Sequence, residues 1–510
     1  MNDTGQLGVP RTLRQRVLRG TLASMFGIAA LGLTRLVYTT MVGRTGSPER
    51  LAEVNAQISL AFIVTFLTAS ATGSAAAKFI PLVTARYSAA AAVRVRRRLA
   101  RWTAVGTVAC MAVVGLIGLF APGLLPGGSP GGSSGEPGQQ LIWLVLLIGT
   151  YGAYTFTKSV LYGYHRAARY ATLEICADLG TLALTVVAVY WLPTALLAPL
   201  ALGYGAFAVA AALSAPSVPQ GERPDLGREV GGFVLLTAVG VVASQGFFQA
   251  SMVVAGHAVS GQQAGVYAAA MSLVSPAFFL PRALALAFFP AAAEAVGRGD
   301  AEGGRAELAT RTGQLTGLLW ATMLPAFTVG AILGEPVMRL LYGSAYAGGG
   351  PVLGLMFAAV LLYVVAVPSV NALSAHELTQ AKVPPLASVA GVLVGGVVWL
   401  VAGPTLGAVG VALGYFCGLT VQAGTPLLVA SNRLGYRPGR ASTLRAVAGG
   451  AAGVLAATVA IALTSTLVTL GCLLLFAAGY LALYGGQLRS LMRGRRFRSG
   501  ETGAPAPTDP

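Results

Sequence analysis

The sequence predicts an all-α polytopic membrane protein of about fourteen transmembrane helices, built as two parallel six-helix lobes followed by two further helices. Three observations support this prediction. Apolar runs of roughly twenty residues recur along the whole chain. Basic residues fall in alternate loops between these runs, and patterns of the first six runs return in the next six.

The composition excludes an ordinary soluble protein. Hydrophobic residues make up 55% of the 510 residues and charged residues only 10%, with a mean hydropathy of +0.72. A soluble surface needs far more charge than this. Each apolar run is long enough to cross a hydrocarbon core of ~30 Å. The predicted helices span residues 20–42, 55–78, 101–122, 140–163, 171–191, 194–214, 230–255, 265–289, 313–334, 351–373, 385–402, 405–430, 444–465 and 467–488.

The distribution of charge predicts the topology. The net charge is +17, and with fourteen helices 28 Lys and Arg side chains fall on the side of the two termini, against only Arg44, Arg50 and Arg339 on the opposite side. Cytoplasmic loops carry such an excess of basic residues. We therefore expect both termini to be cytoplasmic, in the plasma membrane of a bacterium. Because the arginines sit in short loops between apolar runs, nucleic acid is not expected as a partner.

An internal repeat defines the expected lobes. Ala201-Leu202-Gly203-Tyr204 recurs as Ala412-Leu413-Gly414-Tyr415, and Ser59-Leu60 recurs as Ser272-Leu273, at offsets of 211 and 213 residues. Six helices per half is an even number, so the two halves run parallel, as in transporters whose lobes are related by an axis along the membrane normal. The expected parts are a cytoplasmic N-terminus at 1–19, an N-lobe at 20–214, a cytoplasmic linker at 215–229, a C-lobe at 230–430, helices 13 and 14 at 444–488, and a basic tail at 489–510.

Basic side chains at membrane depth are candidates for binding an anionic substrate. An ionisable group in a membrane helix is costly, so it usually faces a cavity or a partner. Arg35 and Arg282 would be the anion-binding groups of a central cavity, because the planar guanidinium binds phosphate oxygens in pairs. The alternative is that each extends to an interface or pairs with a carboxylate. Lys158, near the end of its helix, is a weaker candidate, because it reaches the interface easily.

Two carboxylates and two amides lie at helical spacing inside apolar runs. Glu174 and Asp178 share one helix face, and two like charges one turn apart favour proton uptake by one of them. They are candidates for a coupling-ion site, with a structural ion pair to Lys158 as the alternative. Gln245 and Gln249 repeat this spacing and are candidates for substrate binding or for hydrogen bonds between helices.

The sequence offers no catalytic or metal site. The three histidines, His165, His257 and His376, are far apart and show no paired ligand spacing. We expect no catalytic residues, no metal and no cofactor. The arginine-rich stretch from Ala89 to Arg101 has two interpretations: a cytoplasmic topology signal, or an amphipathic helix on anionic lipid.

Several short motifs resemble one family in their order and spacing. They are Val42-Gly43-Arg44, Ala76 to Pro81, Gly265-Val266-Tyr267-Ala268-Ala269-Ala270 with Pro290, Glu335 to Tyr346, Asn371 to Ala375, and Gly407 to Ala412. This pattern resembles the lipid-linked oligosaccharide and polysaccharide flippases (polysaccharide biosynthesis proteins) of the multidrug/oligosaccharidyl-lipid/polysaccharide (MOP) superfamily. Many members have twelve helices, whereas lipid II flippases have fourteen, as predicted here.

The resemblance implies a V-shaped, MATE-like transporter that works by alternating access. Its substrate would be an oligosaccharide linked to undecaprenyl pyrophosphate, moved to the outer leaflet for cell-surface polysaccharide synthesis through a cationic cavity. The expected partners are this glycolipid, membrane lipids and H⁺ or Na⁺, with the membrane potential as another driving force, and the protein would act as a monomer. Two alternatives remain. One is a multidrug cation antiporter of the same superfamily, and the other is a membrane glycan polymerase or ligase.

Overall fold

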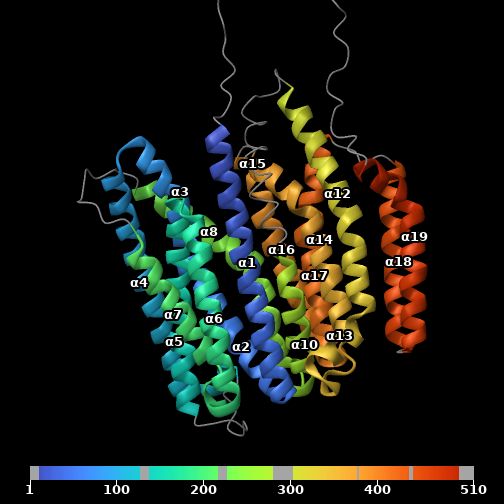
Figure 1. Ribbon diagram of the computed structural model, residues 1–510, viewed down its shortest axis with the longest axis horizontal. Helices are drawn as coiled ribbons and strands as arrows, with labels where there is room; N and C mark the ends of the chain where they lie inside the picture. The colour runs from blue at the N-terminus through green and yellow to red at the C-terminus, as the bar shows by residue number, and fades with distance from the viewer. Residues whose placement is uncertain are drawn as a thin grey trace, which may run out of the picture.

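The computed structural model describes residues 11–126, 137–215, 227–278, 303–375, 378–435, 440–463 and 465–492. Every regular element within these ranges is a helix (Figure 1). Twelve helical stretches there are long and apolar enough to cross a membrane, and each coincides with one of the fourteen predicted helices. The other two predictions correspond to a shorter apolar helix at Ala198–Leu213 and to a helix at Gly261–Val274; the last part of the predicted span 265–289 lies outside the described residues. The all-helical polytopic fold class is therefore confirmed.

The first group of helices forms what we call the N-terminal bundle. Its elements are α1 (Arg11–Thr45), α2 (Pro48–Thr65), η1 (Phe66–Ser70), α3 (Ala71–Arg86), α4 (Ala89–Phe120), η2 (Pro122–Leu124), α5 (Pro137–Gly163), α6 (Ala167–Trp191), η3 (Pro193–Ala195) and α7 (Ala198–Leu213). The π-helical turn η1 joins α2 and α3 into one continuous stretch. Helix α4 starts at Ala89 because the Ser88 hydroxyl accepts a hydrogen bond from the N–H of Ala91, at 3.1 Å. The arginine-rich stretch is thus the first part of a membrane-crossing helix that was predicted to begin at 101, and not a separate surface helix.

The second group forms the C-terminal bundle. Its elements are α8 (Gly227–Val241), η4 (Val242–Gly246), α9 (Phe247–Ala258), α10 (Gly261–Val274), η5 (Ser275–Phe278), α12 (Gly304–Ile332), α13 (Gly334–Tyr342), η6 (Ser344–Tyr346), α14 (Gly350–Ala375), α15 (Leu378–Ala381), α16 (Val383–Leu406) and α17 (Ala408–Leu434). A second π-helical turn, η4, joins α8 and α9 into one stretch. The two bundles meet where α9 and α10 pack on α2 and where η4 contacts η1.

Corresponding helices make corresponding contacts in the two bundles. Helix α5 packs on α7 as α14 packs on α17, and α6 packs on α7 as α16 packs on α17. The contact of α6 with α7 and the contact of α16 with α17 each depend on a glycine. A Cβ atom on Gly203 would overlap Thr181 of α6, and one on Gly414 would overlap Trp399 of α16. Both glycines belong to the repeated Ala-Leu-Gly-Tyr pattern, so the repeat has a steric reason: it brings two helices into close contact.

The last two helices stand beside the C-terminal bundle (Figure 1). Helices α18 (Arg440–Leu463) and α19 (Thr466–Met492) pack on each other and on α12. The Tyr480 hydroxyl of α19 donates a hydrogen bond to the carbonyl of Ala321 in α12. Helix α1 begins and α19 ends at the same end of the molecule, at the top of Figure 1. We call this end the basic face, because Arg94 to Arg101 of α4 lie toward it, and the other end the opposite face.

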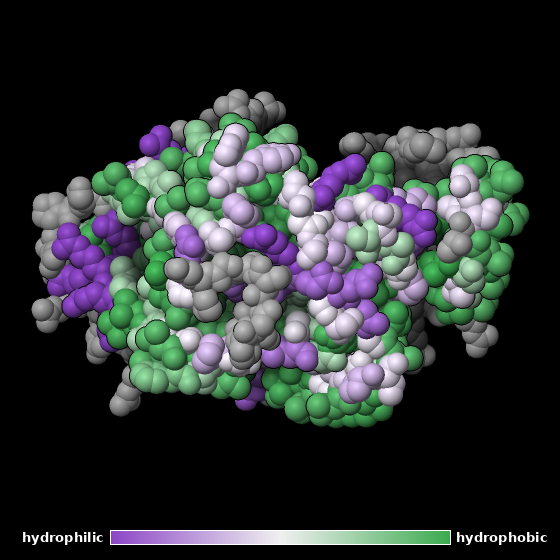
Figure 2. Space-filling model, turned by 90° about the horizontal axis from the view of Figure 1, so that it is seen from below, coloured by the Kyte–Doolittle hydropathy of each residue, from purple (hydrophilic) through white to green (hydrophobic). Residues whose placement is uncertain are grey.

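The outer surface is apolar, as a bilayer requires. Large hydrophobic side chains on peripheral helices are widely exposed, among them Leu119 at 70%, Leu400 at 80% and Leu467 at 81%. Figure 2, a view of the opposite face, shows hydrophobic residues around much of the perimeter and polar residues gathered across the middle. A surface of this kind is stable against lipid chains and would aggregate in water. The protein is thus a multi-pass membrane protein.

Candidate functional site

Two carboxylates are buried together inside the N-terminal bundle. Helix α6 lies between α1 and α7, and it presents Glu174 and Asp178 one turn apart on its inner face. Their exposed fractions are 2% and 8%. Burial of ionised carboxylates at this depth is expensive unless partners compensate them. The predicted common face is present in the structure, and the question becomes which groups surround it.

A tyrosine links the carboxylates to the lysine predicted beside them. The Tyr154 hydroxyl donates a hydrogen bond of 2.6 Å to Oε1 of Glu174, and it accepts one of 3.1 Å from Nζ of Lys158. The Lys158 ammonium also lies 4.6 Å from the centre of the Tyr154 ring, a cation–π distance. Lys158 is thus held inside the bundle at the edge of the carboxylate pair and does not extend freely into the aqueous phase.

One oxygen of each carboxylate is available to a further ligand. Asp178 hydrogen-bonds to the Thr34 hydroxyl of α1. Its Oδ2, like Oε2 of Glu174, is buried and has no hydrogen-bond partner among the described residues. Both residues line a small cavity together with Arg35, Thr181 and other residues of α1, α5, α6 and α7. Buried polar atoms without partners are rare in native structures, so this cavity is suited to a proton or a small cation.

Arg35 lies on the wall of this same cavity. Its guanidinium carbon is 4.4 Å from the centre of the Phe62 ring of α2, within the range of a cation–π contact. The position is close enough for its charge to act on the hydroxyls of Tyr38 and Tyr204. This stacking anchors the Arg35 guanidinium between α1 and α2. The N–H donors of the guanidinium stay available for another acceptor.

An aromatic cluster surrounds these groups, and sequence reasoning missed it. The ring of Tyr151 stacks on Phe62 at 3.9 Å, and Tyr204 lies 5.0 Å from Tyr151 and 4.8 Å from Tyr154. The repeat offered a signal for it, because Tyr204 and its counterpart Tyr415 are both buried against aromatic rings, the latter against Phe247. Tyrosines at matching places in two apolar helices were treated only as repeat markers.

The two glutamines of the predicted helix 230–255 do not share an environment. Gln245 is exposed and Gln249 is 7% exposed, with a buried Oε1 that has no partner among the described residues. Gln245 belongs to the π-helical turn η4, whereas Gln249 lies on α9. The amide of Gln422 on α17 donates a hydrogen bond of 3.4 Å to the carbonyl of Ala243 in this turn. The residues of η4 thus act at the packing surface between helices.

Arg282, the second predicted anion-binding residue, lies outside the described residues. Within the described ranges, no three His, Cys, Asp or Glu side chains gather in a way that could hold a metal ion. The donors of the α6 cavity are two carboxylates and the hydroxyls of threonine and tyrosine. Oxygen donors of this kind suit hard cations and not soft transition metals.

The two bundles are bonded to each other at the opposite face. Nη1 of Arg44 donates a hydrogen bond of 2.6 Å to the carbonyl of Leu340, and the Tyr346 hydroxyl donates one of 3.1 Å to the carbonyl of Gly43. The hydroxyls of Thr39 and Tyr342 are 3.4 Å apart. These bonds join α1 to α13 and η6. We call this set the clasp.

The sequence motifs of the resemblance lie where the two bundles meet. The first glycine of the Gly265-Val266-Tyr267 motif lies against Pro48 of α2, and a Cβ atom there would overlap the Pro48 backbone. The Glu335–Tyr346 motif supplies both tyrosines of the clasp. These residues are therefore required where α10 and α13 meet the N-terminal bundle.

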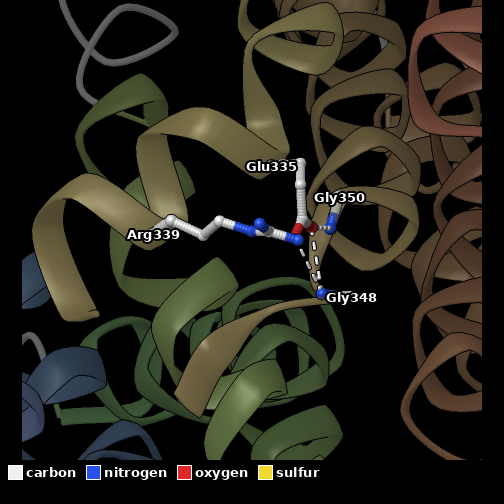
Figure 3. A network of polar contacts seen from close by, with 4 residues as sticks. All are labelled: Glu335, Arg339, Gly348 and Gly350. Carbon is white, nitrogen blue, oxygen red and sulfur yellow. Dashed lines mark hydrogen bonds and ion pairs between the residues drawn. The ribbon is translucent and has the colours of Figure 1, made fainter. Parts of the chain in front are cut away.

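A buried glutamate orders the clasp (Figure 3). Glu335 at the start of α13 accepts hydrogen bonds from the N–H of Gly348, at 3.0 and 3.1 Å, and from the N–H of Gly350, at 3.1 Å. Nε of Arg339 bonds to the same carboxylate at 2.7 Å. Burial alone would raise the pKa of Glu335, but the N–H of Gly348, the Arg339 guanidinium and the N–H of Gly350 together hold this pKa below its ordinary value. The carboxylate thus ties the loop after α13 to the first turn of α14.

Comparison with known proteins places the fold. No family model and no curated protein matches the sequence. Among solved structures, the lipid II flippase MurJ in an inward closed conformation is 16% identical with a TM-score of 0.67, and the match covers 93% of this chain and all of that one. A MOP superfamily transporter from Pyrococcus furiosus, described by the reverse polarity of its binding pocket, is 15% identical with a TM-score of 0.60 over 82% of this chain and 95% of its own.

An inward-facing multidrug transporter of the MATE family is also similar. It is 16% identical with a TM-score of 0.61, over 79% of this chain and 94% of its own. These likenesses show the fold alone, which the chain shares with the lipid II flippase and with multidrug transporters. Flippases and multidrug transporters share this fold, so the substrate class has to be argued from the chain itself.

Proposed function

We propose that the chain is a flippase that moves an oligosaccharide linked to undecaprenyl pyrophosphate from the cytoplasmic to the outer leaflet, for the synthesis of cell-surface polysaccharide. The observation that carries this proposal is the extent of the structural match. Helices α18 and α19 hold 24 and 27 residues, more than the 7% of the chain that the MurJ match leaves out. That match therefore takes in part of these two helices, whereas the MATE match leaves out far more of the chain.

The proposed topology places the basic face in the cytoplasm, with lobes at 20–214 and 230–430. Support comes from the corresponding helix contacts of the two bundles and from the excess of basic residues on the side of the termini. Cysteines introduced at Ser133 and Ser442, after replacement of the four native cysteines, test the orientation. We expect Ser133→Cys to label from outside and Ser442→Cys from inside. Labelling of both from one side would contradict the topology.

In this proposal the pyrophosphate binds to Arg35 and Arg282, with Lys158 as an additional cation and with Gln245 and Gln249 as polar contacts. The position of Arg35, anchored on Phe62 with donors to spare, supports its role. Arg35→Ala and Arg282→Ala should each abolish flipping without loss of protein. Arg282→Lys should restore only part, because lysine keeps the charge but loses the paired geometry of the guanidinium. Full transport by both alanine variants would remove these residues from the substrate site.

The carboxylate cavity is proposed as the coupling site. Glu174 and Asp178 would take up H⁺ or Na⁺ through the oxygens that have no partner among the described residues. Arg35 lines the same cavity. The charge of the two carboxylates therefore sets how strongly they attract the Arg35 guanidinium. When a cation neutralises the pair, Arg35 is released to meet the pyrophosphate. Loading of the cation and of the substrate would in this way be linked.

A multidrug cation antiporter is the second candidate. Buried carboxylates beside Phe62, Tyr151, Tyr154 and Tyr204 form an environment that attracts organic cations. Against it stands Arg35 on the wall of that cavity, which would repel a cationic drug.

Reconstituted vesicles separate the two functions. Purified protein in proteoliposomes should move fluorescently labelled lipid II, used as a probe of the pyrophosphate-linked class, from one leaflet to the other. It should not accumulate ethidium. Ethidium uptake without movement of the glycolipid would contradict the proposal and favour the antiporter.

A further inference from the structure

One face of α4 points outward along its whole length. Val105, Val108, Leu116 and Leu119 are exposed at 71%, 62%, 53% and 70%. Val105 and Val108 are three residues apart, as are Leu116 and Leu119. The exposed Ala112 lies four residues from both Val108 and Leu116, so all of these residues form one stripe along the helix. Because the stripe is apolar and belongs to a membrane-crossing helix, it faces lipid chains.

The same stripe continues into arginines at the basic face. Steps of three and four from Val105 toward the start of α4 reach Arg101, then Arg98 and Arg97, then Arg94. Arg101 lies about 6 Å along the helix axis from Val105, at 1.5 Å per residue. The Arg98 guanidinium lies 4.8 Å from the centre of the Trp102 ring, and tryptophan prefers the interface of a membrane. These arginines therefore lie at the level of lipid headgroups and on the lipid side of the helix.

The protein provides no counter-charge for them within its described part. Arg311 pairs with Glu307 and Arg339 pairs with Glu335, both on other helices. Nε of Arg94 is buried and has no hydrogen-bond partner there. In Figure 2 a hydrophilic patch interrupts the apolar perimeter on the side where Figure 1 draws α4. Three exposed cations on one outward stripe call for an anionic partner from outside the chain.

We propose that the outward arginines Arg97, Arg98 and Arg101 of α4 form a binding surface for the phosphate headgroups of anionic phospholipids in the leaflet at the basic face. A topology signal requires only that basic residues lie on one side of the membrane. It does not require them to continue the lipid-facing stripe. Guanidinium groups bind phosphate oxygens in pairs, while Val105 and Val108 contact the acyl chains of the same lipids. The bound lipids would then fix the depth of α4 in the membrane.

Native mass spectrometry of the full-length protein in detergent tests this surface. Phosphatidylglycerol and phosphatidylcholine with identical acyl chains are titrated separately, and bound lipids are counted. We expect phosphatidylglycerol to bind at least several-fold more tightly. Arg98→Gln/Arg101→Gln should weaken its binding about 25-fold, since each basic residue near an anionic surface contributes roughly a fivefold factor in affinity. Arg98→Lys/Arg101→Lys should retain most of it.

The matched control removes the same charge elsewhere. Arg169→Gln/Arg311→Gln takes two arginines from other helices whose side chains bond to Ser214 and Glu307, and its binding of phosphatidylglycerol should stay near that of the wild type. If the double variant of α4 does not fold, the single variants Arg98→Gln and Arg101→Gln carry the test, each with a loss of a few-fold. Equal binding of the two lipids by the wild type, or an equal loss in the control, would overturn the proposal.

Discussion

The Tyr346 hydroxyl donates a hydrogen bond of 3.1 Å to the carbonyl oxygen of Gly43, across 303 residues of sequence. This bond joins η6 of one bundle to α1 of the other. Helix α1 is also the helix that carries Arg35 and Thr34 to the carboxylate cavity. The clasp and the cavity are thus connected through one rigid element, so opening of the opposite face has to move α1 relative to α13.

Loss of the tyrosine bond should loosen the opposite face. A neutral hydrogen bond contributes about 1 kcal/mol, and so Tyr346→Phe should raise the population of molecules open at this face about fivefold. Distances between spin labels at Thr45 and Leu340, measured by double electron–electron resonance, report this population. Tyr190→Phe, an exposed tyrosine of α6, is the control. An unchanged distance distribution in Tyr346→Phe would show that the bond does not hold the clasp.

Neutralising Glu335 should destabilise the protein and remove one source of acid sensitivity. Glu335→Gln loses charge-assisted bonds to two N–H groups and Arg339, at a cost of about 1–3 kcal/mol. The pKa of Glu335 is lowered in the folded state, so its stabilisation is complete above the ordinary glutamate pKa of ~4.3 and is lost as the pH falls through the folded-state pKa. Thermal unfolding is measured in detergent at a series of pH values. As the pH is lowered, the unfolding temperature should fall less in Glu335→Gln than in Glu307→Gln. Equal curves for the wild type and Glu335→Gln would refute the role.

A side chain at Gly265 should prevent the clasp from closing. The Pro48 backbone occupies the place of a Cβ atom at this position, and backbone cannot move aside cheaply. Gly265→Ala should therefore favour the open form and slow transport at least tenfold. Gly424→Ala in α17 is the matched control, because nothing lies within 4 Å of the added methyl group. Wild-type flipping by Gly265→Ala would mean that α2 and α10 separate more easily than this packing implies.

The carboxylate pair should set the ion dependence of transport. Asp178→Asn and Glu174→Gln remove the charge and keep the shape, so flipping should become independent of an imposed proton or sodium gradient in both. Tyr154→Phe should weaken this dependence, because it breaks the link between Glu174 and Lys158. Glu229→Gln, at an exposed site of α8, is the control. Retention of full gradient dependence in Asp178→Asn would make the pair a structural feature.

Sequence patterns predicted the structural features that are set by residues close together in the sequence, within one helix. Membrane spans, and the common face of Glu174 and Asp178, follow from periodicity and are present in the structure. Features that depend on contacts between distant helices escaped prediction. Tyr154 reaches Glu174 from α5, and Thr34 reaches Asp178 from α1, and no local pattern records such packing. The π-helical turn η4, which holds Gln245, is likewise not predicted by a period of 3.6.

The most direct test of the proposed flippase combines transport with control of the clasp. Cysteines at Arg44 and Leu340, whose groups are bonded across the two bundles, are bridged by a short bis-methanethiosulfonate, which forms a disulfide with each thiol, in proteoliposomes that contain labelled lipid II. Alternating access predicts flipping before the reaction, a stop once the bridge forms, and recovery when reductant cleaves it. Movement of the glycolipid that continues at the same rate with the bridge in place, or no movement by the unbridged protein, would contradict the account.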